Sequence, residues 1–338
     1  MRERAARLSV SWGHRSDHPT GRGTGHPLDE RSEGVGSTVG TLNAERLRDW
    51  WLGRRYQLLS PIGRGGAGTV FRGMDERLAR PVAIKVVDLA GVRPRDIGRF
   101  AAEARVLGGL AHPGLVALLD VGADLGPTRE PLAYLVMELV EGVTLATMLD
   151  RGPLDPGQAA DVGQQLAQAL DHAHAAGIVH RDVKPANILL SAEPVVSGHI
   201  AGPSVTTKLA DFGIALGPTA AADETLSDRT RGTASYLSPE QALAQTLGPP
   251  SDVYSLGLVL LESLTGVRAY PGGALSSSLA RLLATPDVPE RLGPRWSSLL
   301  RGMTTMVPEA RPTASDVAEA LRQMRRPALW DRVAARLD

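Results

Sequence analysis

Residues 180–187 read HRDVKPAN and residues 211–213 read DFG, and these two stretches are the most informative part of the sequence. They carry four side chains of distinct chemistry: Asp182, Lys184, Asn187 and Asp211. Carboxylate and amide oxygens are ligands that Mg²⁺ prefers, and a carboxylate can also accept a proton. The chance that both stretches arise together in this order is negligible, so we interpret them as one site.

These four side chains suit the transfer of a phosphoryl group. Such a transfer needs metal ions on the phosphates, a carboxylate at the attacking hydroxyl, and positive charge near the moving group. Asp182 can accept the hydroxyl proton, and Lys184 can stabilise the transferred group. Asn187 and Asp211 can supply oxygen ligands to the metal.

A glycine-rich turn lies upstream, where residues 63–70 read GRGGAGTV and fit G-x-G-x-x-G-x-V. Glycines let the backbone turn tightly and bring its N–H groups against phosphate oxygens, where a Cβ would collide. Alone this motif is weak, because dinucleotide-binding folds use the same spacing. Here the turn lies between two expected strands instead of opening a helix, which counts against a dinucleotide site.

Lysine is rare in this chain: of 37 Lys and Arg residues, only Lys85, Lys184 and Lys208 are lysine. Lys85 lies in the apolar expected strand 82–87, which begins VAIK, and a charge there is costly unless it is paired. We expect phosphate oxygens and Glu103, on the next helix, to be its partners; the alternative is an edge-strand lysine facing water. For Lys208 we favour a solvent-facing strand position.

The order of expected elements predicts an α+β protein with a small sheet lobe and a larger helical lobe. Short β-branched or apolar runs predict strands, and apolar residues at helical spacing predict helices. The expected strands are 56–62, 69–74, 82–87, 115–122 and 133–138, and the expected helices are 95–110, 156–176, 251–265, 275–283, 296–303 and 313–324.

The chain divides by composition. Its first residues are rich in Gly, Ser, Thr, Arg and His and predict a disordered arm. Asn43 can cap a short helix that Gly53 ends, with Trp50 and Trp51 as a hydrophobic anchor or, less favoured, a ligand cage. The expected units are an arm 1–42, a short helical lead-in 43–55, a main domain 56–326 with lobes 56–138 and 141–326, and a short amphipathic tail 327–338.

Overall charge and composition give no partner. Lys+Arg and Asp+Glu both total 37, so no net field favours nucleic acid or an acidic membrane. There are no cysteines, and we find no apolar run of the roughly 18 residues that crosses a bilayer. We therefore expect a cytoplasmic protein without a membrane span.

On these motifs the chain resembles the eukaryotic-type protein kinases, most closely the bacterial serine/threonine branch, over about residues 56–326. The resemblance implies a two-lobed fold, with an antiparallel-sheet N-lobe that carries one key helix and a mainly helical C-lobe. It implies ATP and Mg²⁺ as cofactors, with Mn²⁺ possible in place of Mg²⁺, and protein substrates. In this reading the chain is an ATP-dependent serine/threonine protein kinase.

The resemblance also assigns roles to single residues. Asp182 would be the catalytic base, helped by Lys184, with Lys85 held by Glu103 and with Asn187 and Asp211 on the metal. A spine of Leu107, Leu118, His180 and Phe212 would join the lobes, anchored by Asp252. The ATP-binding residues would be Ile62, Gly63, Gly65, Gly68, Val70, Ala83, Lys85, the gatekeeper Met137, the hinge residues Glu138 and Val140, and the adenine floor Leu189.

Residues 233–240 read TASYLSPE and resemble the peptide-docking end of an activation segment; we call them the docking segment. Thr233 together with Lys184 is the serine/threonine pattern, and Glu240 should pair with Arg311. We expect autophosphorylation of Thr225 and Ser227, between molecules in a transient homodimer, since relatives carry phosphorylated residues at these positions. Residues 191–207 are longer than usual and predict an extended hairpin tip.

Two other classes of protein stay open at this point. A pseudokinase scaffold would lack one of Lys85, Asp182, Asn187 or Asp211, and this chain keeps all four. A small-molecule phosphotransferase of related fold would lack the docking segment, which serves only to bind a peptide.

Overall fold

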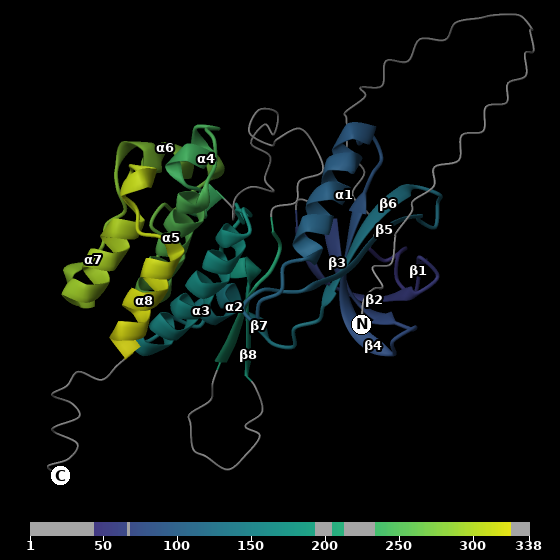
Figure 1. Ribbon diagram of the computed structural model, residues 1–338, viewed down its shortest axis with the longest axis horizontal. Helices are drawn as coiled ribbons and strands as arrows, with labels where there is room; N and C mark the ends of the chain where they lie inside the picture. Colours follow the sequence, from purple (N-terminus) through teal and green to yellow (C-terminus); the bar gives the residue numbers. More distant parts are fainter. Residues whose placement is uncertain (1–43, 66–67, 193–204, 213–233, 326–338) are drawn as a thin grey trace, which may run out of the picture. The chain divides into compact units, whose positions relative to one another are not determined.

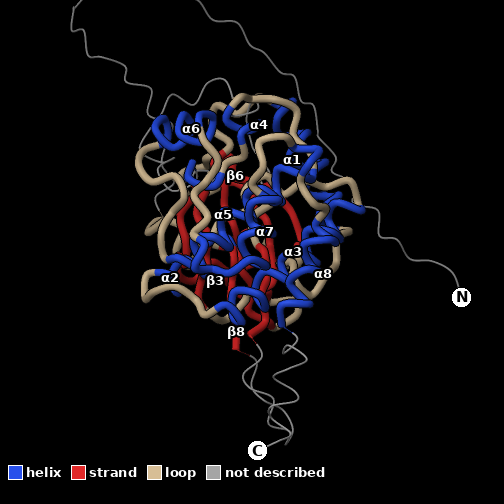
Figure 2. The backbone as a smooth tube through the Cα atoms, turned by 90° about the vertical axis from the view of Figure 1, so that its left-hand side faces the viewer, coloured by secondary structure: helices blue, strands red, loops and turns tan. Residues whose placement is uncertain are grey.

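The computed structural model describes residues 44–65, 68–192, 205–212 and 234–325. A sheet with one helix beside it forms the first part, and most of the helices gather in the second part (Figure 1). Figure 2, turned by 90°, shows helices of the second part in front of the strands. The α+β arrangement expected from the sequence is confirmed.

The first sheet has six strands in the order β1-β2-β3-β4-β6-β5, and each neighbouring pair is antiparallel. Alternate residues of β6 point to opposite faces, so Leu132 and Val136 enter one apolar cluster while Leu135 enters another. The strands are β1 Trp51–Leu52, β2 Tyr56–Gly65, β3 Gly68–Asp75, β4 Arg80–Asp88, β5 Leu118–Leu125 and β6 Pro131–Glu138.

Helix α1, Pro94–Gly108, packs beside this sheet. Pro94 at its start and Asp96 in its first turn favour a helix N-terminus. Its residues Phe100 and Ala104 are buried in the cluster that contains Leu135. Because α1 covers the Leu135 face, the residues of β4 that share that face lie next to this helix.

The prediction of a short helix over residues 43–52 is wrong. Residues 44–49 form hydrogen-bonded turns, and Trp51–Leu52 form strand β1. Asp49 has a positive φ of 61°, which a right-handed helix excludes, and its N–H donates to Leu58 O at 2.8 Å. Backbone hydrogen bonds at Asp49 and Trp50 thus join the lead-in to Leu58 of β2. Trp50 packs on the sheet, whereas Trp51 is exposed.

The second part of the chain is built around a buried helix, α5. Every residue from Ser251 to Ser263 is buried, as expected for a helix that is apolar on nearly all sides. The helices are α2 Leu145–Leu149, α3 Pro156–Ala175, α4 Pro239–Ala242, α5 Pro249–Thr265, α6 Ala274–Leu283, α7 Gly293–Met303 and α8 Ala314–Arg325. Short 3-10 helices are η1 Pro185–Asn187, η3 Ala234–Tyr236, η4 Glu290–Leu292 and η5 Pro308–Ala310.

A second, small sheet has the order β7-β8-β9. Its strands are β7 Val143–Thr144, β8 Ile188–Ala192 and β9 Val205–Leu209, and β8 pairs antiparallel with β9. These two strands are the stem of the hairpin whose tip was expected to be extended. The tip itself, residues 193–204, lies outside the described residues.

Candidate active site

The loop before β8 gathers three of the expected catalytic residues. Lys184 Nζ donates to Asp182 Oδ2 at 2.7 Å, and Asn187 Nδ2 donates to the same oxygen at 2.9 Å. Asn187 also donates to the backbone carbonyl of Asp182 at 2.9 Å. These contacts hold the Asp182 carboxylate in one orientation while about a quarter of its side chain, 26%, stays exposed. A carboxylate so placed can accept a proton from an incoming group.

Asp252, in the first turn of α5, anchors this loop through hydrogen bonds to its backbone. It is 1% exposed and accepts from the backbone N–H groups of His180 and Arg181, both at 2.8 Å. Arg181 has a φ of 69°, a conformation that is unfavourable for a residue with a Cβ. The two bonds to Asp252 stabilise that conformation and so fix the residue next to Asp182.

His180 connects the loop with Phe212. Its Nδ1 accepts from Asp182 N at 3.2 Å, so its Nε2 carries the proton and donates to Ala210 O at 3.1 Å. Burial lowers the pKa of this imidazole below its usual range, although nearby Asp252 opposes the effect. The ring lies 4.6 Å from that of Phe212, centroid to centroid. His180 is therefore neutral, and both of its nitrogens are in use.

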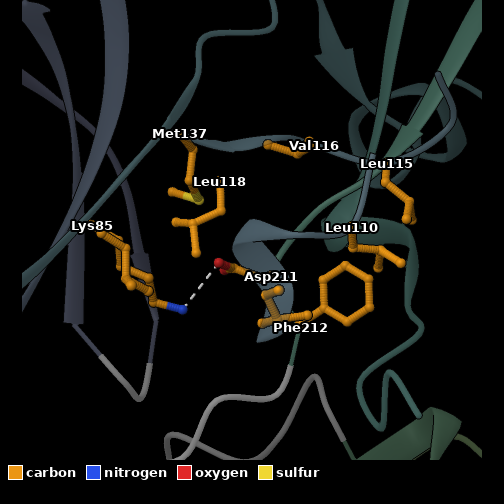
Figure 3. A pocket seen from close by; sticks show the side chains of 10 residues that line it. Lys85, Leu110, Leu115, Val116, Leu118, Met137, Asp211 and Phe212 are labelled. Carbon is orange, nitrogen blue, oxygen red and sulfur yellow. Dashed lines mark hydrogen bonds and ion pairs between the residues drawn. The ribbon is translucent and has the colours of Figure 1, made fainter. Parts of the chain in front are cut away.

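Lys85 pairs with Asp211 in this structure. Its Nζ lies 3.0 Å from Asp211 Oδ1, as the dashed line in Figure 3 shows. The expected pair between Lys85 and Glu103 is not formed, although both residues are among those described. An ammonium is a compact charge that pairs with the carboxylate that reaches it. Asp211, with a φ of 58°, turns its carboxylate toward β4 and takes that place.

A cavity opens beside this ion pair. Figure 3 shows the side chains of Met137, Leu118 and Phe212 around it, next to Lys85 and Asp211. Two of the expected spine residues, Leu118 and Phe212, therefore face a common space, and Leu107 of α1 lines it too. Its complete lining is Lys85, Leu107, Leu110, Leu115, Val116, Leu118, Leu135, Met137, Asp211 and Phe212.

One face of the first sheet carries four of the residues expected to bind ATP. Directly opposed residues on antiparallel strands share a face, and Val70 opposes Lys85 while Ala83 opposes Met137. Gly68 has a φ of 140°, and a Cβ there would lie 2.3 Å from Val86 O, so only glycine fits.

The other expected ATP-binding residues lie on three segments. Gly63 and Gly65 are in β2 beside the half-exposed Ile62, Val140 follows β6, and Leu189 lies in β8. The tip of the glycine turn, residues 66–67, lies outside the described residues.

The solvent-facing position expected for Lys208 is wrong. Lys208 Nζ donates to Glu138 Oε1 at 2.8 Å, and its side chain is 19% exposed. The same Glu138 oxygen accepts from Ala117 N at 2.8 Å. Residues 114–116 run beside β9, bonded through Leu209, and cover the edge that the sequence left open. Lys208 thus links β9 to the end of β6, a role that sequence reasoning missed.

The docking segment is described from Ala234 onward, so Thr233 lies outside the described residues, as do Thr225 and Ser227. Glu240 and Arg311 form the expected pair, with NH1–Oε1 at 2.7 Å and NH2–Oε2 at 3.0 Å. Burial raises the pKa of Glu240, but the hydrogen bonds from Arg311 and Ser251 outweigh it, and the net pKa is lowered. The pair is therefore charged at neutral pH.

Asn187 and Asp211 suit a hard cation such as Mg²⁺. Asn187 Nδ2 is committed to Asp182, which leaves its amide Oδ1 as the atom that can bind a metal. Backbone pairing between Ala210 N and Asn187 O, at 2.8 Å, keeps the two segments adjacent. Mg²⁺ typically binds one or two protein oxygens together with substrate phosphates and water, so this donor set fits.

Comparison with known proteins agrees with this geometry. The family model described as "Protein kinase domain" matches residues 56–321. The chain is 40% identical over 284 residues to the serine/threonine-protein kinase PknA of Mycobacterium tuberculosis, covering 82% of this chain and 63% of that protein. It is 41% identical over 279 residues to PknL of Mycobacterium bovis, covering 80% of this chain and 64% of that protein.

PknB of Mycobacterium leprae is 44% identical over 227 residues, covering 65% of this chain and 34% of that protein. The chain therefore belongs to the protein kinase domain family, which confirms the resemblance. It spans less than two thirds of the length of these curated relatives. Among the helices described, none combines the length and the apolar character needed to span a bilayer.

Proposed function

We propose that this chain transfers the γ-phosphoryl group of ATP to serine or threonine hydroxyls of proteins. The observation that carries the proposal is the arrangement of Asp182, oriented by Lys184 and Asn187 on a loop that Asp252 anchors. The names of the relatives, serine/threonine-protein kinases, agree with it.

Asp182 would act as the base. It accepts the proton of the acceptor hydroxyl as that oxygen forms a bond to the γ-phosphorus. The bond between the γ-phosphorus and the β–γ bridging oxygen breaks, and ADP leaves. Lys184, already 2.7 Å from Asp182, contributes positive charge beside the moving group.

The face of the first sheet would hold the nucleotide. The backbone of residues 63–68 would cover the phosphates, with Ala83 and Leu189 on either side of the adenine. Lys85 would exchange Asp211 for phosphate oxygens and Glu103. Asp211 and Asn187 would hold Mg²⁺, with Mn²⁺ as a substitute, and a metal there neutralises phosphate charge.

Thr233 would place the acceptor hydroxyl near Asp182 and favour serine and threonine over tyrosine. We retain autophosphorylation at Thr225 and Ser227, in a transient homodimer, as part of the proposal. Cytoplasmic action is also part of it, because ATP is abundant there, and fractionation of cells that express the full-length protein tests it.

Radiolabelled ATP with dephosphorylated casein as the acceptor tests the function. Wild-type protein should label casein, whereas Asp182→Asn and Asp211→Asn should abolish labelling while keeping the wild-type melting temperature. Asp211→Asn should also weaken binding of Mg·ATP. Wild-type turnover in either variant contradicts the assigned site, and ATP binding without any transfer by the wild type favours a scaffold.

A further inference from the structure

Arg281 in α6 is a buried cation that forms no ion pair with a carboxylate among the residues that the structure describes. It is 0% exposed. Burial lowers the pKa of its guanidinium below the usual range. A buried charge is unfavourable unless polar groups compensate it, so polar groups around Arg281 must supply that compensation.

Two backbone carbonyls of the docking segment supply the compensation. Arg281 NH1 donates to Leu237 O and NH2 donates to Ala234 O. The guanidinium carbon also lies 4.9 Å from the ring centroid of Tyr270, a cation–π contact. The guanidinium therefore spans both ends of the stretch from Ala234 to Leu237.

Among the described residues, the side chains of this stretch form no hydrogen bond to α6. The Ser235 hydroxyl is buried and has no hydrogen-bond partner within the part of the chain described, and the same holds for Arg281 Nε. Tyr236 O is held from α5, accepting from Ser255 Oγ at 2.8 Å. Within the described ranges, the hydrogen bonds between this backbone and α6 are therefore the two from Arg281.

The docking segment is in turn joined to the catalytic loop. Gln241 lies in the short helix α4, which begins within the docking segment, and donates through Nε2 to Arg181 O at 2.7 Å. Arg181 directly precedes Asp182. A shift of residues 234–237 would therefore alter where a docked peptide lies relative to the base.

We propose that Arg281 is a positioning residue for the protein substrate: it fixes the docking segment relative to Asp182 and so sets the affinity for the acceptor peptide. This inference rests on the proposed function. Neither carbonyl belongs to the ATP face, so nucleotide binding should not depend on Arg281.

The test compares full-length Arg281→Lys and Arg281→Met with wild type, using ATP and dephosphorylated casein. Arg281→Met should raise KM for casein about tenfold or more, with KM for ATP within twofold and kcat within about threefold. Arg281→Lys, whose single ammonium cannot span both carbonyls, should fall between. The matched control is Arg295→Met, which removes an exposed arginine on α7 and should change nothing.

Hydrogen exchange supplies a second readout. The amides of residues 234–238 should exchange at least about tenfold faster in Arg281→Lys, while those of β4 keep their wild-type rates. An unchanged KM for casein in a folded Arg281→Met protein overturns the inference. So does a variant in which KM for casein and KM for ATP rise, and kcat falls, by the same factor. If Arg281→Met does not fold, the same criteria apply to Arg281→Lys.

A wild-type protein that labels no acceptor refutes the proposed function separately. Hydrogen exchange then decides the positioning role alone, and unchanged protection of residues 234–238 in Arg281→Lys overturns it.

Discussion

Lys208 of β9 is bonded to Glu138 at the end of β6, with 2.8 Å between Nζ and Oε1. The ammonium also approaches Leu115 O at 3.5 Å, and Glu138 accepts from Ala117 N. One ion pair thus ties the second sheet, the end of the first sheet and the segment between α1 and β5.

Removal of this pair should loosen the region expected to read adenine. Lys208→Met should lower the free energy of unfolding by about 1 kcal/mol and raise KM for ATP a few-fold. A double-mutant cycle with Glu138→Gln should give a coupling of about 0.5–1 kcal/mol by urea denaturation. The control is the exposed Arg72–Glu141 pair, where coupling should be near zero. Zero coupling at Lys208–Glu138 contradicts this prediction.

Substitutions of Lys85 and Glu103 should affect catalytic turnover, and the Glu103 substitution should do so without changing the free energy of unfolding. Lys85→Arg should reduce kcat/KM at least about 100-fold although it keeps the charge, because the planar fork cannot occupy the place of an ammonium. Glu103→Gln should leave the free energy of unfolding within about 0.5 kcal/mol of wild type, since Glu103 does not hold Lys85 in this structure. It should nevertheless slow transfer, and full activity in Glu103→Gln would remove it from the catalytic set.

Acid should destabilise the protein through His180. Its folded-state pKa is lowered by burial, so below the ordinary value of about 6.5 the unfolded chain binds a proton that the folded chain does not. The stabilisation is present above that pH and falls as the pH drops toward the folded pKa. The slope for one proton is at most about 1.4 kcal/mol per pH unit.

His180→Gln should reduce this slope between pH 6.5 and 5, measured by urea denaturation at each pH. His112, whose pKa is also lowered by burial, should account for part of the slope that is left. Nuclear magnetic resonance of the His180 ring should show the neutral form with its proton on Nε2. A charged His180 at pH 6.5 is the result that contradicts the prediction.

Thr225 and Ser227 should carry phosphate in the active protein. The resemblance to protein kinases implies that Arg181 would put a fixed positive charge beside the segment that carries Thr225 and Ser227. A phosphate group would bring about two negative charges that can order such a segment. Mass spectrometry should find both phosphates in wild type and neither in protein made with Asp182→Asn. Full activity of the Thr225→Ala, Ser227→Ala double variant would disprove activation by phosphorylation of these two residues.

The sequence predicted the parts of the site that depend on side-chain type and local spacing. Asp182, Lys184 and Asn187 lie within a few residues of one another, so a single loop brings them together, and the donor types needed for phosphoryl transfer can be read directly. The continuous apolar run of β6, which is buried on both faces, and the apolar character of α5 likewise follow from the local sequence.

The partners of charged groups were decided by the tertiary structure. Lys85 could pair with Glu103 or Asp211, and only the placement of Asp211 beside β4 selects the latter. The lead-in joined β2 as turns and a strand, because backbone bonds to Leu58 replaced those of a helix.

Lys208 and Arg281 show the same division. From the sequence, each could be predicted only as a cation in an expected strand or helix. Their partners, Glu138 for Lys208 and the carbonyls of Ala234 and Leu237 for Arg281, are distant along the chain. Local sequence patterns do not show which distant groups come close to a charge in space. The free energy of a buried charge depends on the distances to those groups. The types of catalytic side chain could therefore be predicted from the sequence, whereas the partners of the charged side chains depend on the tertiary structure.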